Sequence, residues 1–204
     1  MNAAAGRRIV TGRRIVAAGV TVLLLAIGGA AILLSPRDAD VTAPIEVVGA
    51  AGHLVSAREL AVRVDGVRLA RRVVYPTESD PPSSTTAGVW VVVDATVSGG
   101  RQETTAQWSQ LRLAGSTFSL AADAGFSSLN ARTFAVGVPF RGSFVFEVSA
   151  SALTAAMRSG GRAELVLRDT PNGIPDSQPV VRLRLSGLRI ASSAAVRDPG
   201  VAER

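Results

Sequence analysis

The sequence predicts an all-β domain, an antiparallel two-sheet sandwich, behind one N-terminal transmembrane helix. Three observations lead to this fold class. An uncharged apolar run covers residues 15–34, apolar side chains alternate with polar ones in later segments, and clusters of Gly, Pro, Ser and Asn separate those segments. Alternation with a period of two is typical of half-buried strands. No second long helical pattern follows, so we do not expect a parallel βαβ sheet.

The N-terminal segment predicts a membrane anchor. The run from Ile15 to Leu34 is uncharged, and at about 1.5 Å per residue it covers about 30 Å, the thickness of a bilayer's hydrocarbon core. Four arginines precede it without acidic neighbours: Arg7, Arg8, Arg13 and Arg14. The positive-inside rule then places residues 1–14 in the cytoplasm and everything after the span outside. We therefore expect a single-pass cell-membrane protein with an extracytoplasmic C-terminal domain.

A cleaved export signal is the alternative for this segment. A secretory signal has an apolar region of about 7–15 residues before a small-x-small cleavage site, and the run here is longer. The sites that fit best lie inside the run and would leave Ile32, Leu33 and Leu34 on the mature protein. The doubled arginines also raise a twin-arginine signal, although neither copy carries a fuller motif. The length of the run favours a retained anchor.

Charge and composition narrow the function classes. The formal charge is +6, but four of the 22 basic residues precede the apolar run and all 16 acidic residues follow it. The external part is therefore nearly balanced, which argues against a nucleic-acid partner. The chain has no cysteine, so disulfides, thiolate nucleophiles and thiolate metal sites are excluded. A domain of this size buries enough apolar surface to fold without them.

The external part divides into a linker, a sandwich and a tail. Residues 35–44 form a proline-containing linker, residues 45–190 the sandwich, and residues 191–204 a tail that we expect to be disordered. The clearest strand is 89–97, with an uninterrupted apolar face. Asp65-Gly66 predicts a hairpin turn from 60–64 into 67–69. The other expected elements are strands at 45–48, 108–113, 117–120, 133–138, 143–148, 163–168 and 181–185, and a helix at 150–157.

Two segments carry a resemblance to a known family. They are Gly88–Val97, a strand before a polar loop, and Gly137–Val148, a turn followed by a strand. Together they resemble a bacterial family of uncharacterised envelope domains with an immunoglobulin-like sandwich, akin to the small secreted immunoprotective antigen of mycobacteria. The resemblance covers about residues 50–188 and implies that fold behind a membrane anchor or a lipoprotein signal. It brings no catalytic residues, and Ser98-Gly99-Gly100 stands where many members have an asparagine.

Motifs for catalysis and metal binding are weak. The single histidine, His53, needs a nucleophile and an acid to form a triad; Ser127 and Asp123 are available, but Gly125–Leu129 lacks the second glycine of a nucleophile elbow. The 169–176 loop has oxygen ligands for calcium, yet its Asn-Gly and prolines are equally typical of a plain turn. We therefore predict no catalytic residue, no metal and no cofactor.

Two kinds of side chain predict an interaction surface. Trp90 and Trp108 alternate with the apolar face of their strands, and outward tryptophans commonly anchor partners, although a neighbouring segment can equally cover them. Four arginines occupy outward strand positions: Arg63, Arg68, Arg182 and Arg184. If the first and last strands are neighbours, these form a basic stripe facing anionic lipid or an acidic wall polymer; a solvated face is the alternative.

The sequence thus favours a non-catalytic single-pass envelope protein whose external sandwich binds or scaffolds a partner, either an envelope protein or an anionic wall or lipid component. Three alternatives stay open. One is a cleaved, secreted immunoglobulin-like factor, and another is an accessory subunit of a membrane transporter or sensor. The least favoured is a serine hydrolase built around His53.

Overall fold

The computed structural model describes residues 19–30, 44–76, 83–122, 128–170 and 177–202. The chain divides into two compact units, Met1–Thr42 and Ala43–Arg204. In the first unit, residues 19–30 form a helix. Nowhere in the described ranges is a helix both long and apolar enough to cross a membrane. The predicted cytoplasmic segment, the two ends of the predicted span and the linker before Pro44 lie outside the described residues.

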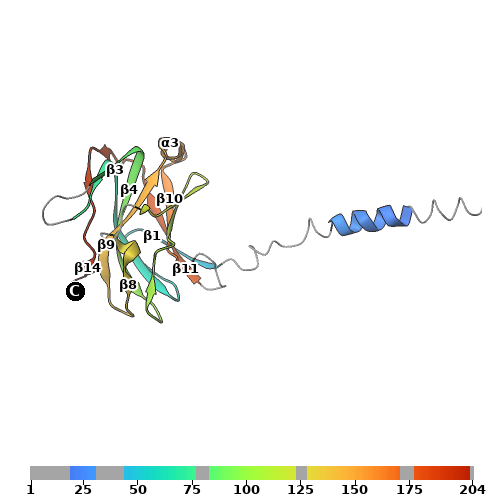
Figure 1. Ribbon diagram of the computed structural model, residues 1–204, viewed down its shortest axis with the longest axis horizontal. Helices are drawn as coiled ribbons and strands as arrows, with labels where there is room; N and C mark the ends of the chain where they lie inside the picture. Colours follow the sequence, from blue (N-terminus) through green and yellow to red (C-terminus); the bar gives the residue numbers. More distant parts are fainter. Residues whose placement is uncertain (1–18, 31–43, 77–82, 123–127, 171–176, 203–204) are drawn as a thin grey trace, which may run out of the picture. The chain divides into compact units, whose positions relative to one another are not determined.

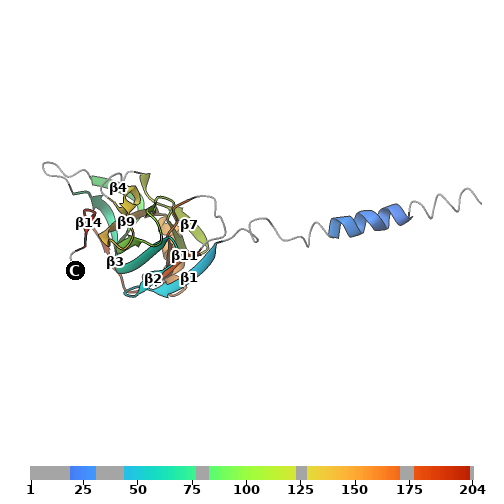
Figure 2. The ribbon, with the colours of Figure 1, turned by 90° about the horizontal axis from the view of Figure 1, so that it is seen from below.

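The second unit is a β-sandwich, as the sequence predicted. Two sheets form its layers in the described part of the chain, and Figures 1 and 2 show them on opposite sides of the domain. The five-stranded sheet has the order β1 (Ile45–Ala50), β11 (Ser177–Arg184), β10 (Arg162–Val166), β6 (Gln110–Leu113) and β7 (Ser116–Ser119). The seven-stranded sheet has the central order β3 (Leu60–Val74), β4 (Ser83–Gly99) and β9 (Phe140–Val148).

Short strands complete the second sheet and add a small third one. β2 (Leu54–Ser56), β12 (Ile190–Ala191) and β13 (Ala194–Ala195) pair with β3, and β14 (Gly200–Val201) pairs with β9. β5 (Thr104–Thr105) and β8 (Thr133–Phe134) form a separate two-stranded sheet. The antiparallel prediction is right for most pairs, but β1 runs parallel to β11, and β12 and β13 run parallel to β3.

The core lies between the two large sheets because each strand turns its apolar positions inward. On β4 these are Val89, Val91, Val93, Ala95 and Val97, each at most 1% exposed. They pack in one cluster with inward residues of the five-stranded sheet, among them Leu111, Leu165 and Val181. The alternation read from the sequence therefore reports this packing directly.

One helix, α3 (Ala150–Arg158), connects β9 to β10 as predicted. It begins at Ser149, whose hydroxyl accepts a hydrogen bond from the Ala152 backbone N–H. Leu153 and Ala156 are buried in the core cluster, so the helix closes one end of the sandwich.

The predicted hairpin at Asp65-Gly66 is wrong. β3 continues from Leu60 to Val74 and pairs with β4 on both sides of this dipeptide. The register shifts between Val64 and Gly66, so one extra residue is absorbed as a bulge. Because the long β4 offers a partner along the whole length, the chain gains more hydrogen bonds by continuing than by turning.

The prediction of a disordered tail is also wrong for the described residues 191–202. The segment 190–201, here called the C-terminal strap, pairs first with β3 and then with β9. It therefore crosses the outer face of the seven-stranded sheet. Ala194 is 7% and Val196 3% exposed, and the Val196 N–H donates to the Val74 carbonyl at 2.8 Å. Burial of these apolar side chains on the sheet stabilises the ordered strap, which the composition of the segment alone did not predict.

Candidate functional site

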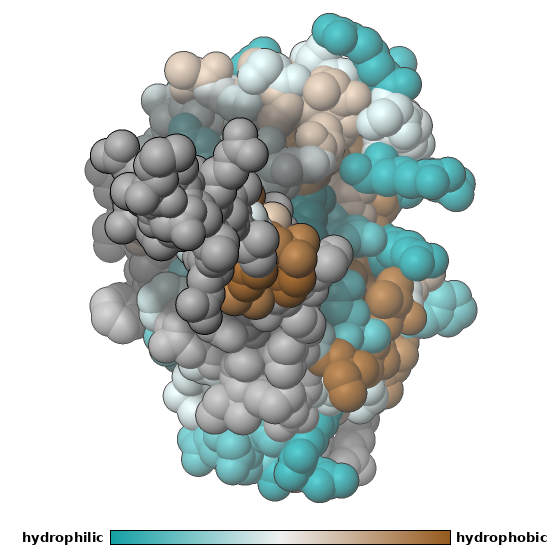
Figure 3. Space-filling model, turned by 90° about the vertical axis from the view of Figure 1, so that its right-hand side faces the viewer, coloured by the Kyte–Doolittle hydropathy of each residue, from teal (hydrophilic) through white to brown (hydrophobic). Residues whose placement is uncertain are grey.

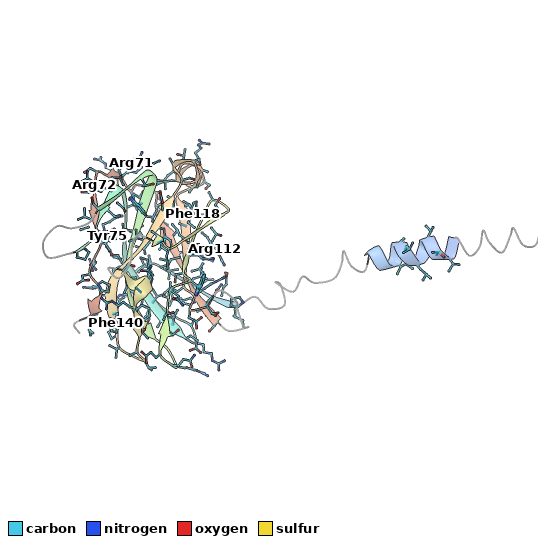
Figure 4. The ribbon with its side chains drawn as sticks, in the orientation of Figure 1. Arg71, Arg72, Tyr75, Arg112, Phe118 and Phe140 are labelled. Atoms are coloured by element: carbon cyan, nitrogen blue, oxygen red, sulfur yellow. The ribbon has the colours of Figure 1, made fainter. Side chains whose placement is uncertain are left out.

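Trp90 is not available on the surface. Its side chain points to the outer face of the seven-stranded sheet, as the alternation predicted, but it is 2% exposed. The C-terminal strap covers it, and together they form a second apolar cluster that comprises Trp90, Ala70, Val73, Tyr75, Val92, Val145, Ala194 and Val196. Figure 4 shows Tyr75 on the side of the sandwich opposite Arg112. Trp90 therefore packs within the fold and is not an exposed anchor in this structure.

Arg68 holds this strap in place. Its guanidinium makes a two-pronged contact with Asp94, with Nε 3.1 Å from Oδ2 and Nη2 2.7 Å from Oδ1, and Nη1 donates to the Ala195 carbonyl at 2.8 Å. Asp94 is 6% exposed and also accepts from the Ser143 hydroxyl. Ser143 Oγ in turn accepts from the Arg197 backbone N–H at 2.9 Å. Arg68 is therefore engaged within the domain.

The charge of Arg63, on the same outer face, is also paired with an acidic side chain. Its Nε lies 3.1 Å from Asp65 Oδ1, and Asp65 also accepts from the Thr96 hydroxyl. Trp108, the second predicted anchor, is 46% exposed in the turn before β6. A single half-exposed tryptophan is common on protein surfaces, so it does not define a site alone.

The predicted basic stripe does not form, because its arginines lie on two different sheets. Arg63 and Arg68 belong to β3 in the seven-stranded sheet, whereas Arg182 and Arg184 belong to β11 in the five-stranded sheet. Each pair points outward, away from the core that the two sheets share, so the sandwich separates them. The outer face of the five-stranded sheet must be considered by itself.

On that outer face the strand register places charged residues in neighbouring rows. Arg182 of β11 stands opposite Glu164 of β10, and Glu164 stands opposite Arg112 of β6. One row further along, Arg184 stands opposite Arg162. Figure 3 views the molecule from the side on which β10 and β11 lie in Figure 1, and hydrophilic side chains project there.

Two acidic side chains of this face converge on one arginine. Arg112 Nη1 lies 2.7 Å from Glu46 Oε1 and 3.8 Å from Glu164 Oε2. To reach Glu46 on β1, the Arg112 side chain must cross β10 and β11, and Val166 and Val180 beneath this path are fully buried although they point outward. The ion pair therefore covers one half of the face.

Arg168 and Gln178 extend this paired half. Arg168 Nε donates to Gln178 Oε1 at 2.8 Å, and Gln178 Nε2 lies 3.3 Å from Glu46 Oε1. Burial lowers the pKa of Arg168, and the nearby Arg112 guanidinium lowers it further, while Glu46 raises it. The positive charges of this face thus repel one another, and its carboxylates only partly offset them.

The other half of the face carries three exposed arginines that form no ion pair among the described residues. Within the described ranges, Arg162, Arg182 and Arg184 form no side-chain hydrogen bond or ion pair. They line a surface hollow of about 880 Å³ together with Glu164, Ala50 and Ala51. The sequence pattern identified Arg182 and Arg184 but missed Arg162, because the predicted strand began one residue later. Arg162 and Glu164 flank the apolar Ala163, and this alternation was the available signal.

Most residues that the sequence analysis weighed for catalysis or metal binding lie outside the described residues. His53 is exposed in the turn between β1 and β2, and Ser127 and Asp123 lie outside the described residues. The 169–176 loop is described only at Asp169 and Thr170. Across the described ranges there is no group of three or more His, Cys, Asp or Glu side chains that would hold a metal ion.

Comparisons with known proteins give limited likenesses. The chain matches no protein-family model and no curated protein. An uncharacterised β-sandwich protein from Clostridium difficile 630 is 13% identical, covers 74% of this chain and 100% of its own, and has a TM-score of 0.45. A candidate lipoprotein from Staphylococcus aureus is 6% identical, covers 72% of this chain and 97% of its own, and has a TM-score of 0.41. With TM-scores below 0.5, neither structure defines a family for this chain.

Proposed function

We propose that the protein is a non-catalytic component of the bacterial cell envelope whose β-sandwich binds an anionic partner. The observation that carries this proposal is the arginine half-face, formed by Arg162, Arg182 and Arg184, none of which forms an ion pair among the described residues. Guanidinium groups form strong bidentate contacts with carboxylates and phosphates, and three of them on adjacent strands produce a local positive potential. The sequence's lack of a catalytic motif and the resemblance to immunoglobulin-like envelope domains agree with a binding role.

The proposal includes a membrane anchor at residues 15–34, with residues 1–14 in the cytoplasm. The helix at 19–30 supports it, because this helix contains no charged residue and all of its side chains are exposed. Val20, Leu23 and Leu25, for example, are 50%, 60% and 71% exposed. An all-round apolar helix of this kind needs an apolar surrounding.

The anchor predicts that the chain stays in membranes with an intact N-terminus. We expect a C-terminally tagged full chain to remain in the membrane pellet after an alkaline wash, and added protease to digest the tag in cells with a permeabilised wall. Mass spectrometry should find residues 1–14 on the membrane-bound protein. A soluble product lacking these residues would instead establish the secreted alternative.

The arginine half-face predicts loss of anion binding on charge reversal. We expect the full chain in neutral detergent to bind at least one of two polyanions, inorganic polyphosphate or poly-L-glutamate, at low salt. The double substitution Arg182→Glu with Arg184→Glu should reduce the affinity by more than about 10-fold, because each lost contact to a charged group contributes about 1–3 kcal/mol and repulsion is added. Isothermal titration calorimetry measures the change.

A matched control uses two exposed arginines from elsewhere on the domain. Arg72→Glu with Arg189→Glu changes the net charge equally and should leave the affinity within about two-fold at moderate salt, because distant surface charges are screened. Binding of neither polyanion, or equal losses in both double variants, would overturn the proposed function.

A further inference from the structure

We propose that the hollow beside β10 and β11 binds successive phosphate groups of an extended anionic polymer. This inference rests on the proposed function, since it names the chemistry of the anion that the half-face takes. The binding groups are Arg162, Arg182 and Arg184. Ala50 and Ala51 are the small residues that leave room for the polymer.

The register sets the spacing of the three guanidinium groups. Arg162 and Arg184 are directly opposite on antiparallel strands, where Cβ atoms lie about 4.5–5.5 Å apart. Arg182 precedes Arg184 by two residues on the same face, a distance of about 7 Å along the strand. Side chains of this length and spacing reach a common oxyanion from different strands, or two neighbouring oxyanions of one chain.

Repulsion between Arg162 and Arg184 destabilises the sheet, and a bound anion relieves this repulsion. Like charges directly opposite each other in a sheet destabilise it. Glu46 and Glu164 both lie within 4 Å of Arg112, and neither forms an ion pair with Arg162 or Arg184. An external anion placed between these two side chains supplies the missing negative charge.

Phosphate groups fit the three arginines better than carboxylates do. A carboxylate is planar, and a single guanidinium fork engages both of its oxygens at once. A tetrahedral phosphate presents oxygens in several directions, so forks from β10 and β11 engage it together. The hollow, at about 880 Å³, is too wide and open to enclose a single ion, which favours a chain of such groups lying across it.

The charges around the hollow favour a polymer over the membrane surface itself. The chain enters the domain at Pro44, and β1 then runs from Ile45 to Ala50 beside β11. The hollow therefore lies about 17 Å further along the sheet than the entry point. Glu46, which stands near the entry on the same face, and Glu164 would oppose close contact between this whole face and an anionic bilayer.

Glu164 provides a test with a gain of function. It lines the hollow, stands opposite Arg182 and lies 3.8 Å from Arg112. Its carboxylate repels any anion bound there, whereas Arg112 keeps its closer partner Glu46 when Glu164 is neutralised. Glu164→Gln should therefore strengthen polyphosphate binding, by about three-fold or more, without loosening the Arg112 contact.

The decisive experiment compares three probes with the full chain in neutral detergent: inorganic polyphosphate, poly-L-glutamate of matched length, and phosphatidylcholine vesicles containing phosphatidylglycerol. We expect polyphosphate to bind at least about 10-fold more tightly than poly-L-glutamate. By analogy with single-stranded nucleic acids, three phosphate contacts give a slope of log affinity against log salt near −2. The triple variant Arg162→Gln, Arg182→Gln, Arg184→Gln should remove most of this slope, and Glu164→Gln should strengthen binding.

The matched control neutralises three other exposed arginines, as Arg72→Gln, Arg132→Gln and Arg189→Gln. Circular dichroism checks folding, and the hollow variant should be as stable as the wild type because repulsion between Arg162 and Arg184 is lost. Equal binding of the two polymers overturns the phosphate inference and leaves the anionic-partner proposal standing. Arginine-dependent binding to the vesicles in preference to the polymers overturns the choice of partner. Binding to none of the probes overturns both proposals.

Discussion

Deleting residues 190–204 is expected to expose Trp90 and to lower the free energy of unfolding by about 3–5 kcal/mol. The strap residues Ala194 and Val196 cover the outer face of β4 and β9, where Trp90, Val92 and Val145 are at most 2% exposed. Without the strap, an aromatic side chain and two valines would face water. The edge of β3 would also lose its pairing with β12 and β13.

Intrinsic fluorescence and urea unfolding measure this effect. Trp108 is replaced by Phe in all variants, so that the emission reports Trp90 alone; Trp108 is already 46% exposed. We expect emission at short wavelength with the strap and a shift to long wavelength without it. Ending the chain after residue 202 is the control and should change neither quantity. Val196→Asp, which places a charge beside Trp90 while the strap remains, should be destabilising for the same reason.

An unshifted emission in the truncated chain, with stability within about 0.5 kcal/mol of the control, would show that the strap does not cover Trp90. If the truncated chain fails to fold, Val196→Asp still decides the question, because it tests the same contact with the strap intact. If the strap does not cover Trp90, the seven-stranded sheet is complete without the C-terminal strap.

The strands could be predicted because their burial follows a local rule. On β4 every second residue from Val89 to Val97 is apolar, and these side chains fill the space between the sheets. The C-terminal strap escaped prediction because its burial depends on a partner far away in the sequence. Ala194 and Val196 are small and lie in no clear alternating pattern, and only the Trp90 side chain beneath them gives them something to cover.

In the candidate site, too, some features follow from the local sequence and others depend on distant segments of the chain. That Arg182 and Arg184 point outward follows from alternation with Leu183, so the sequence predicted it. Which sheet a strand joins depends on pairing between distant segments of the chain. Because β11 and β3 join different sheets, Arg182 and Arg184 are separated from Arg63 and Arg68. Asp65-Gly66 is likewise ambiguous, since the same dipeptide suits a hairpin turn or a bulge, and the length of β4 selected the bulge.

Asp94 is expected to be the most important single polar residue for stability. We expect Asp94→Ala to lower the free energy of unfolding by about 2–4 kcal/mol. The carboxylate is almost completely buried and accepts from the Arg68 guanidinium and from the Ser143 hydroxyl, which links it to the strap through the Arg197 N–H. Its removal leaves a hydroxyl and one side of a guanidinium without their acceptor.

A double-mutant cycle separates the ion pair from the rest of this network. Arg68 keeps 38% of its side chain exposed, so Arg68→Ala should cost only about 1–2 kcal/mol, and the Asp94–Arg68 coupling should be smaller than the whole effect of Asp94→Ala. Arg63→Ala, which breaks the more exposed pair with Asp65, is the control and should cost less than about 1 kcal/mol. Urea unfolding provides all of these values. If Asp94→Ala costs no more than Arg63→Ala, burial does not strengthen this contact, and the strap must be held by its apolar residues alone.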